Sequence, residues 1–265
     1  MSSPYSYLIP FLILSSLMSG CFVMEHPYSK LPPGPWRGTL KLDPQKDLME
    51  NIPRETSAQT VLDFDEVTEG DLPFNFEIGY TSEDSLFMTL TNADQVIQLT
   101  DIRFSHDRDT NKDTVFIRFP NSQAFLSAIF EDNVMEGHFS RSPSDLIPVS
   151  FVAHHGQDHR FTLLQKEPTS NLNGRWNMSF QIETDQPSAG TIEIRQTDNE
   201  LLATLHMDSV SYPYLQGTIQ ANKIYLSSFD GLQYLLVEGK VGSDGTIEGV
   251  IRNNTSNFIT WRASR

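Results

Sequence analysis

Apolar and polar residues alternate in short runs along most of the chain after residue 35. The first run sets Trp36, Leu40 and Leu42 on one side against Arg37 and Lys41 on the other. A period of two is that of a strand with one buried face, and no run sustains the period of an amphipathic helix. The sequence therefore predicts an all-β, largely antiparallel fold. The further predicted strands cover 72–80, 86–91, 96–104, 115–120, 125–130, 134–140, 149–152, 175–182, 191–196, 201–207, 215–219, 224–228, 234–241, 247–252 and 258–263.

Turn residues separate these runs. Short strands at regular spacing with such turns are typical of sandwiches and barrels. Pairs that favour tight turns stand at Asp132-Asn133, Asp198-Asn199, Asp230-Gly231, Asp244-Gly245 and Asn253-Asn254.

The two halves of the run of strands resemble each other. Asn111-Lys112 aligns with Asn222-Lys223, and Glu136-Gly137 aligns with Glu248-Gly249 if one residue is inserted between the two pairs in the second half. Each half also opens on a tryptophan strand. We therefore expect two consecutive antiparallel barrel or sandwich units, 36–164 and 165–265, each near the usual domain size.

The second unit opens with Gly174-Arg175-Trp176, which resembles the start of lipocalin-like barrels. That resemblance implies that Arg262, in the last strand, covers Trp176 and closes one end of the barrel. Small barrels of this kind either hold a ligand or fill with side chains. The aromatic residues that would line the cavity or fill the core are Tyr214, Tyr225, Phe229 and Tyr234.

The N-terminus is typical of an export signal. An uncharged apolar run over 7–18 is too short to span a membrane and is followed by Ser19, Gly20 and Cys21. This resembles the lipobox of bacterial lipoproteins, in which the cysteine is acylated and becomes the new N-terminus. We expect a signal peptide over 1–20, a lipid anchor on Cys21 and a Pro-rich tether over 21–35. The alternative is an ordinary cleaved signal.

Charge and cysteine content exclude several functions. The chain has 19 basic and 34 acidic side chains, a net charge of −15, which repels nucleic acid. Cys21 is its single cysteine, so an acylated chain has no disulfide, no redox pair and no thiolate nucleophile. Nor do we find a motif for a cofactor, and we expect none.

Potential ligands concentrate at the end of the first unit, where His154, His155, Asp158 and His159 stand close together. Imidazole is a common metal ligand, but a polar corner between the two units is the interpretation we favour. The stretch from Asp107 to Asp113 alternates oxygen ligands like a calcium loop. It lacks the glycine and the glutamate that such a loop needs, so a charged hairpin turn is the better prediction.

Several motifs together make the chain similar to the N-terminal region of a family of Gram-negative lipoproteins. Those proteins continue into a TlpA-like thioredoxin domain, whereas this sequence stops at Arg265. The resemblance implies association with an envelope thiol–disulfide system but no redox chemistry of the chain itself. The motifs are PPGPWRG at 32–38, LPFNFE at 72–77, AIFEDNVMEG at 128–137, HHGQDHRF at 154–161, LNGRW at 172–176 and YLSSFDG at 225–231.

These observations favour a lipid-anchored periplasmic protein that acts as a non-catalytic binding module. Its expected partners are the membrane, through the anchor, and a thioredoxin-like envelope protein. Three alternatives stay open: a thioredoxin-family oxidoreductase without its catalytic domain, a metal-dependent enzyme that uses the stretch from His154 to His159, and a carrier of a small apolar ligand.

Overall fold

Strands make up the regular structure of the chain. The computed structural model describes residues 31–43, 67–82, 85–108, 111–182, 187–207, 209–255 and 258–265. Within these ranges the elements are the strands β1 to β17, which confirms the all-β prediction. No helix in the described ranges is long and apolar enough to cross a membrane.

Most neighbouring strands of the first sheet follow one another in the chain, and its first strand also pairs with its last. Its order is β4-β3-β2-β1-β9-β8-β7-β6-β5, so the sheet curls like a barrel and stays open between β4 and β5. All pairs are antiparallel, including β1 with β9. The strands are β1 (Gly34–Lys41), β2 (Asp71–Ser82), β3 (Ser85–Asn92), β4 (Gln95–Leu99), β5 (Ile102–Asp107), β6 (Lys112–Arg118), β7 (Phe125–Glu131), β8 (Val134–Ser140) and β9 (Val149–His155).

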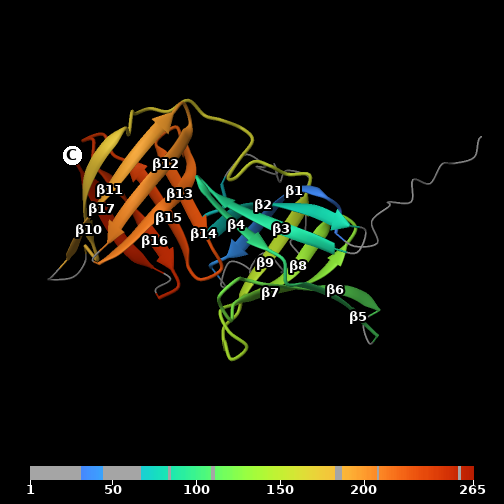
Figure 1. Cartoon of the computed structure of the whole chain (residues 1–265). Coiled ribbons are helices and arrows are strands. Elements are labelled where there is room, and N and C mark those ends of the chain that lie inside the picture. Colours follow the sequence, from blue (N-terminus) through green and yellow to red (C-terminus); the bar gives the residue numbers. More distant parts are fainter. Residues whose placement is uncertain are drawn as a thin grey trace, which may run out of the picture.

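The second sheet is a closed barrel of β10 to β17 in chain order, drawn from yellow to red in Figure 1. Its last strand pairs with its first, with Phe180 opposite Trp261. The strands are β10 (Gly174–Phe180), β11 (Ser188–Thr197), β12 (Glu200–Met207), β13 (Val210–Gln220), β14 (Lys223–Phe229), β15 (Tyr234–Val241), β16 (Ile247–Asn253) and β17 (Ile259–Ser264).

The two sheets follow one plan, as the sequence repeat predicts. Trp36 in β1 donates its indole N–H to the carbonyl four residues earlier, 3.1 Å away, and Trp176 in β10 does the same at 2.9 Å. Two residues before each tryptophan stands a glycine with positive φ, Gly34 at 111° and Gly174 at 114°. Each unit therefore begins with the same backbone turn, which favours glycine.

The pair β4–β5 corresponds to the single strand β13. In the barrel, the first part of β13 pairs with β12 and its last part with β14. In the first sheet β4 pairs with β3, and β5 pairs with β6, with Thr100 and Asp101 between them. The run 96–104, predicted as one strand, is therefore two. A single continuous strand would have to bend sharply to pair first with β3 and then with β6, and the chain makes this bend at Thr100 and Asp101.

Two apolar cores hold the chain together, and one of them crosses from sheet to sheet. The barrel interior has its own core, which includes Trp176, Phe180 and Trp261. The core of the first sheet also contains four residues from the outer face of β14 and β15: Tyr225, Phe229, Tyr234 and Leu236. Figure 1 shows β14 on the side of the barrel that faces β4 and β2.

The placement of these aromatic residues corrects a prediction. Tyr225, Phe229 and Tyr234 were expected inside the barrel, but alternate residues of β14 and β15 point to opposite faces, and these three point out of it. Phe229 packs against Phe74, with ring centroids 4.8 Å apart, and against the rings of two further phenylalanines of the first sheet. Tyr214 is 37% exposed.

Candidate functional site

The expected lipid anchor, Cys21, the signal peptide over 1–20 and most of the tether over 21–35 lie outside the described residues. The described chain begins at Leu31, which is fully buried and accepts a hydrogen bond from the Tyr80 hydroxyl at 2.7 Å. The start of β1 is therefore fixed to the first sheet at the point where a tether would arrive.

The histidine cluster does not form a metal site. His154 and His155 are consecutive in β9, so their side chains point to opposite faces of the sheet. His155 packs against the Trp36 ring and donates from Nε2 to the Pro33 carbonyl at 2.9 Å. Among the described residues no group of three or more His, Cys, Asp or Glu side chains is placed to hold a metal ion. The interpretation as a metal ligand set was wrong.

The segment after β9 instead forms a corner between the two sheets, as favoured. The carbonyls of Asp158 and His159 accept hydrogen bonds from Asn75 at 3.1 and 3.2 Å. Burial, and secondarily the charge of Arg37, lowers the pKa of both His154 and His159. Both imidazoles are therefore held in the neutral form to lower pH than a free histidine.

The described ends of the stretch from Asp107 to Asp113 belong to the antiparallel pair of β5 and β6, with Asp107 opposite Lys112, and residues 109 and 110 lie outside the described residues. Asp113 accepts a hydrogen bond from His106 Nδ1 at 2.8 Å, and this ion pair raises the pKa of that histidine. Asp107 and Asp113 therefore lie on two paired antiparallel strands.

A cation does cover Trp176, but it is not Arg262. The guanidinium carbon of Arg265 lies 4.6 Å from the centroid of the Trp176 ring, and its Nη2 donates to the carbonyl of Asn171. Arg262 forms an exposed ion pair with Glu248. Arg262 lies within β17, whereas Arg265 directly follows the last residue of that strand.

A buried polar network fixes the barrel against the first sheet. The guanidinium of Arg160 donates to Asn92 Oδ1 at 3.0 Å and to the hydroxyl of Ser227 at 2.8 Å. Asn92 also bonds both the N–H and the C=O of Phe229. Burial, together with the charge of Arg37, lowers the pKa of Arg160 to about 9, so it is still protonated at neutral pH.

A groove of about 350 Å³ runs along this junction. His159, Phe161 and Thr162 of the corner form one wall, and the barrel forms the other. Arg160, which also lines the groove, joins the corner to the barrel through Ser227. Its other lining residues are Asn75, Thr91, Asp158, Arg160, Leu163, Gln165, Glu200, Leu201, Leu202, Gln216, Gly217 and Thr218.

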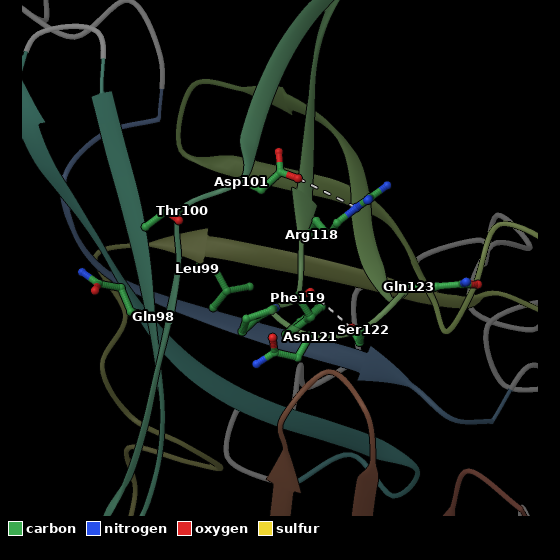
Figure 2. A pocket seen from close by; sticks show the side chains of 10 residues that line it. Gln98, Leu99, Thr100, Asp101, Arg118, Phe119, Asn121, Ser122 and Gln123 are labelled. Atoms are coloured by element: carbon green, nitrogen blue, oxygen red, sulfur yellow. Dashed lines mark hydrogen bonds and ion pairs between the residues drawn. The ribbon is translucent and has the colours of Figure 1, made fainter.

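A larger hollow, of about 530 Å³, lies where the first sheet is open. We call it the bend hollow; it is lined by Gln98–Asp101 and Arg118–Gln123. Figure 2 shows Gln98 on one side, Arg118 on the other and Phe119 between them. The Phe119 ring is fully buried against Phe229, so the floor of the hollow rests on the shared core.

The chemistry of the bend hollow is that of a polar binding surface. Its rim carries the amides Gln98, Asn121 and Gln123 and one carboxylate, Asp101. Both oxygens of Asp101 accept hydrogen bonds from the guanidinium of Arg103, at 2.9 and 3.2 Å. These hydrogen bonds hold the carboxylate in place at the rim of the hollow.

Sequence reasoning did not find the bend hollow. Its residues are amides, hydroxyls and backbone, which carry no motif of their own. One signal was available: the alternation over 96–104 breaks at the polar pair Thr100-Asp101, where the strand bends.

Comparison with known proteins adds little. No family model matches the chain, and no curated protein matches it at a significant level. One solved structure with some similarity is a protein of unknown function from the DUF3598 family of Nostoc punctiforme. The two chains are 10% identical over 87% of this chain and 93% of the other, with a TM-score of 0.24. At that TM-score the superposition supports no inference about shape or function.

Proposed function

We propose that the protein is a lipid-anchored, non-catalytic binding module of the cell envelope and that it holds its partner in the bend hollow. The observation that carries the proposal is the open wall of the first sheet. There a polar hollow of about 530 Å³ lies on a buried aromatic floor. This volume falls within the range of roughly 300–1,000 Å³ that is usual for ligand sites.

Two further features support this function over an enzymatic one. The carboxylate in the hollow is held by Arg103, and the histidines near the junction point in different directions. The partner we propose, from the resemblance to TlpA-like lipoproteins, is a protein of the envelope thiol–disulfide system. The anchor at Cys21 would keep the module at the membrane where such a partner works.

The test is site-specific photo-cross-linking in the intact envelope of a bacterium that produces the protein. A photoreactive residue at Gln123, exposed at the rim of the hollow, should give a reproducible protein adduct. The same residue at Glu193, exposed on β11 of the barrel, is the matched control and should not. Adducts that are equal from both positions, or absent from both, would contradict the proposal.

A further inference from the structure

The edge of β4 is the one wall of the bend hollow that presents a strand with a free side. In the described part of the chain β4 has β3 as its hydrogen-bonded neighbour and ends the sheet. The side chain of Val96 in this strand is 66% exposed, although it is aliphatic. An unpaired edge with an exposed apolar residue is a template on which a further strand can pair.

The hairpin geometry shows which backbone groups face that free side. Asn92 pairs with Gln95 across a turn of two residues, Ala93 and Asp94. The pair that flanks such a turn exchanges both backbone hydrogen bonds, and bonded pairs then alternate along the ladder. Gln95, Ile97 and Leu99 therefore bond to β3. Val96 and Gln98 direct their N–H and C=O groups away from it, to the free side of β4, and Gln98 also lines the hollow.

Charge at the rim indicates what else the occupant carries. Asp101 is flanked by two exposed arginines, Arg103 at 2.9 Å and Arg118 at 3.9 Å. One positive charge is therefore left over beside the hollow, in a chain whose net charge is −15. A carboxylate on the occupant would be attracted to this spot, since guanidinium groups bind carboxylates in a matching planar geometry.

We infer that the bend hollow receives an extended peptide segment of the partner, which pairs as an added strand with the free edge of β4 and places a carboxylate beside Arg118. The inference rests on the proposed function. Main-chain hydrogen bonds to Val96 and Gln98 supply the affinity in this mode of recognition, and the arginines supply the selectivity. The carboxylate is either an acidic side chain or the C-terminus of the segment.

The probe is a phage-displayed library of linear peptides of twelve residues, selected on the full-length chain purified in detergent. Peptides with alternating apolar residues and an acidic residue should be enriched. Selected sequences are then synthesised with a free and with an amidated C-terminus. Equal binding of the two forms assigns the carboxylate to a side chain, and loss on amidation assigns it to the C-terminus. Enriched peptides without any carboxylate, or no enrichment, would overturn the inference.

A matched pair of variants tests the added strand itself. Gln98→Pro removes the outward N–H, which an edge strand tolerates, whereas Gln98→Ala removes the side chain and keeps the N–H. Peptide binding should be about tenfold weaker in Gln98→Pro than in Gln98→Ala, because both variants lose the same side chain and only the proline also loses the N–H. Val96→Pro should repeat the loss, with melting temperatures checked for both proline variants. In the wild type, peptide binding should slow amide exchange at Val96 and Gln98.

The outcome separates the inference from the function on which it rests. If the Gln123 cross-link persists in the Gln98→Pro background and peptides bind the proline variants as they bind the wild type, the partner occupies the hollow without pairing to β4. The strand addition is then wrong and the binding module stands. If the Gln123 cross-link is absent from the wild type, the proposed function itself fails.

Discussion

Two buried tryptophans in the barrel differ in one hydrogen bond. Trp176 donates its indole N–H to the Leu172 carbonyl at 2.9 Å, whereas Trp261 is 2% exposed and its Nε1 has no hydrogen-bond partner among the described residues. A buried donor without a partner costs about 1–3 kcal/mol. Gly239 makes room for the Trp261 ring, since a Cβ there would lie 2.7 Å from a ring carbon.

The two tryptophans give a matched comparison. Both Trp176→Phe and Trp261→Phe lose core volume, but Trp176→Phe also loses a hydrogen bond and a contact with Arg265. We predict that Trp176→Phe lowers the free energy of unfolding by about 1–2 kcal/mol more than Trp261→Phe does. Urea denaturation measures both values. An equal or larger loss in Trp261→Phe would show that its N–H is satisfied in solution.

The histidines at the junction predict a loss of stability in acid. The pKa values of His154 and His159 in the folded protein lie below the value in the unfolded chain. The two histidines therefore cost no stability above about pH 6.5, and the free energy of unfolding decreases as the pH falls from there towards the folded pKa values. The drop in melting temperature from pH 7.5 to 5.0 should therefore be smaller in a His154→Gln, His159→Gln double variant than in the wild type.

His106 provides the opposite control. The hydrogen bond and ion pair with Asp113 raise the pKa of His106 in the folded protein. The stabilisation that the protonated His106 gives the fold is therefore fully present below about pH 6.5 and is lost at higher pH. His106→Gln should then enlarge the acid drop. A double variant as acid-sensitive as the wild type would mean that the junction histidines are solvated like free histidine.

At the scale of the element, strand positions could be predicted well, because alternation is a local signal. Each predicted run from 36–42 to 258–263 overlaps an observed strand. The bend at Thr100-Asp101 was not predicted, because it depends on which strands become neighbours, and an alternating run carries no such information. For the same reason the bend hollow, the candidate site, had no motif. In the histidine cluster, which did look like a motif, His154 and His155 lie on opposite faces of β9 and His159 lies beyond the strand.

The repeated Glu-Gly pairs make a prediction at this scale. A Cβ on Gly137 would lie 2.0 Å from the Ser127 carbonyl oxygen, and one on Gly249 would lie 1.9 Å from that of Glu238. Gly137→Ala and Gly249→Ala should each destabilise the protein by about 1–3 kcal/mol, because a backbone contact cannot rotate away. Chemical denaturation measures this. Ser127→Ala, at an exposed neighbouring position, is the control and should change stability by less than about 0.5 kcal/mol.

At the scale of the whole molecule the two units are unequal. The barrel fills its interior with its own side chains, while the core of the first sheet includes Tyr225, Phe229 and Tyr234 from the barrel surface. Sequence pattern shows that a strand has an apolar outer face, but not what covers it. The two units could therefore be predicted from the sequence, but the core that they share could not.

Separated fragments should show this inequality. We predict that residues 165–265 fold alone, with a β-type circular dichroism spectrum and a cooperative melt, and bind a dye for exposed apolar surface. Residues 21–164 should show no cooperative melt, because they lose the rings that fill their core. If residues 21–164 melt cooperatively by themselves, the first unit does not need the side chains of the barrel in order to fold.

The anchor belongs to this scale as well. We predict that Cys21→Ser abolishes palmitate labelling and moves the protein from the membrane to the soluble fraction, because the thiol is the acceptor of the lipid. Cell fractionation with a labelled fatty acid measures both. Ser19→Ala, which keeps a small residue before the cysteine, is the matched control and should still be labelled. Unchanged labelling in Cys21→Ser would refute the anchor.

The most direct test of the account is amide hydrogen exchange at the edge of β4, measured by mass spectrometry on the peptide that covers residues 93–101. The account predicts slow exchange when the protein is labelled in the intact envelope with its partner and fast exchange when the same chain is purified alone in detergent. Equal exchange rates in the two samples would contradict a partner bound at the bend hollow by strand addition.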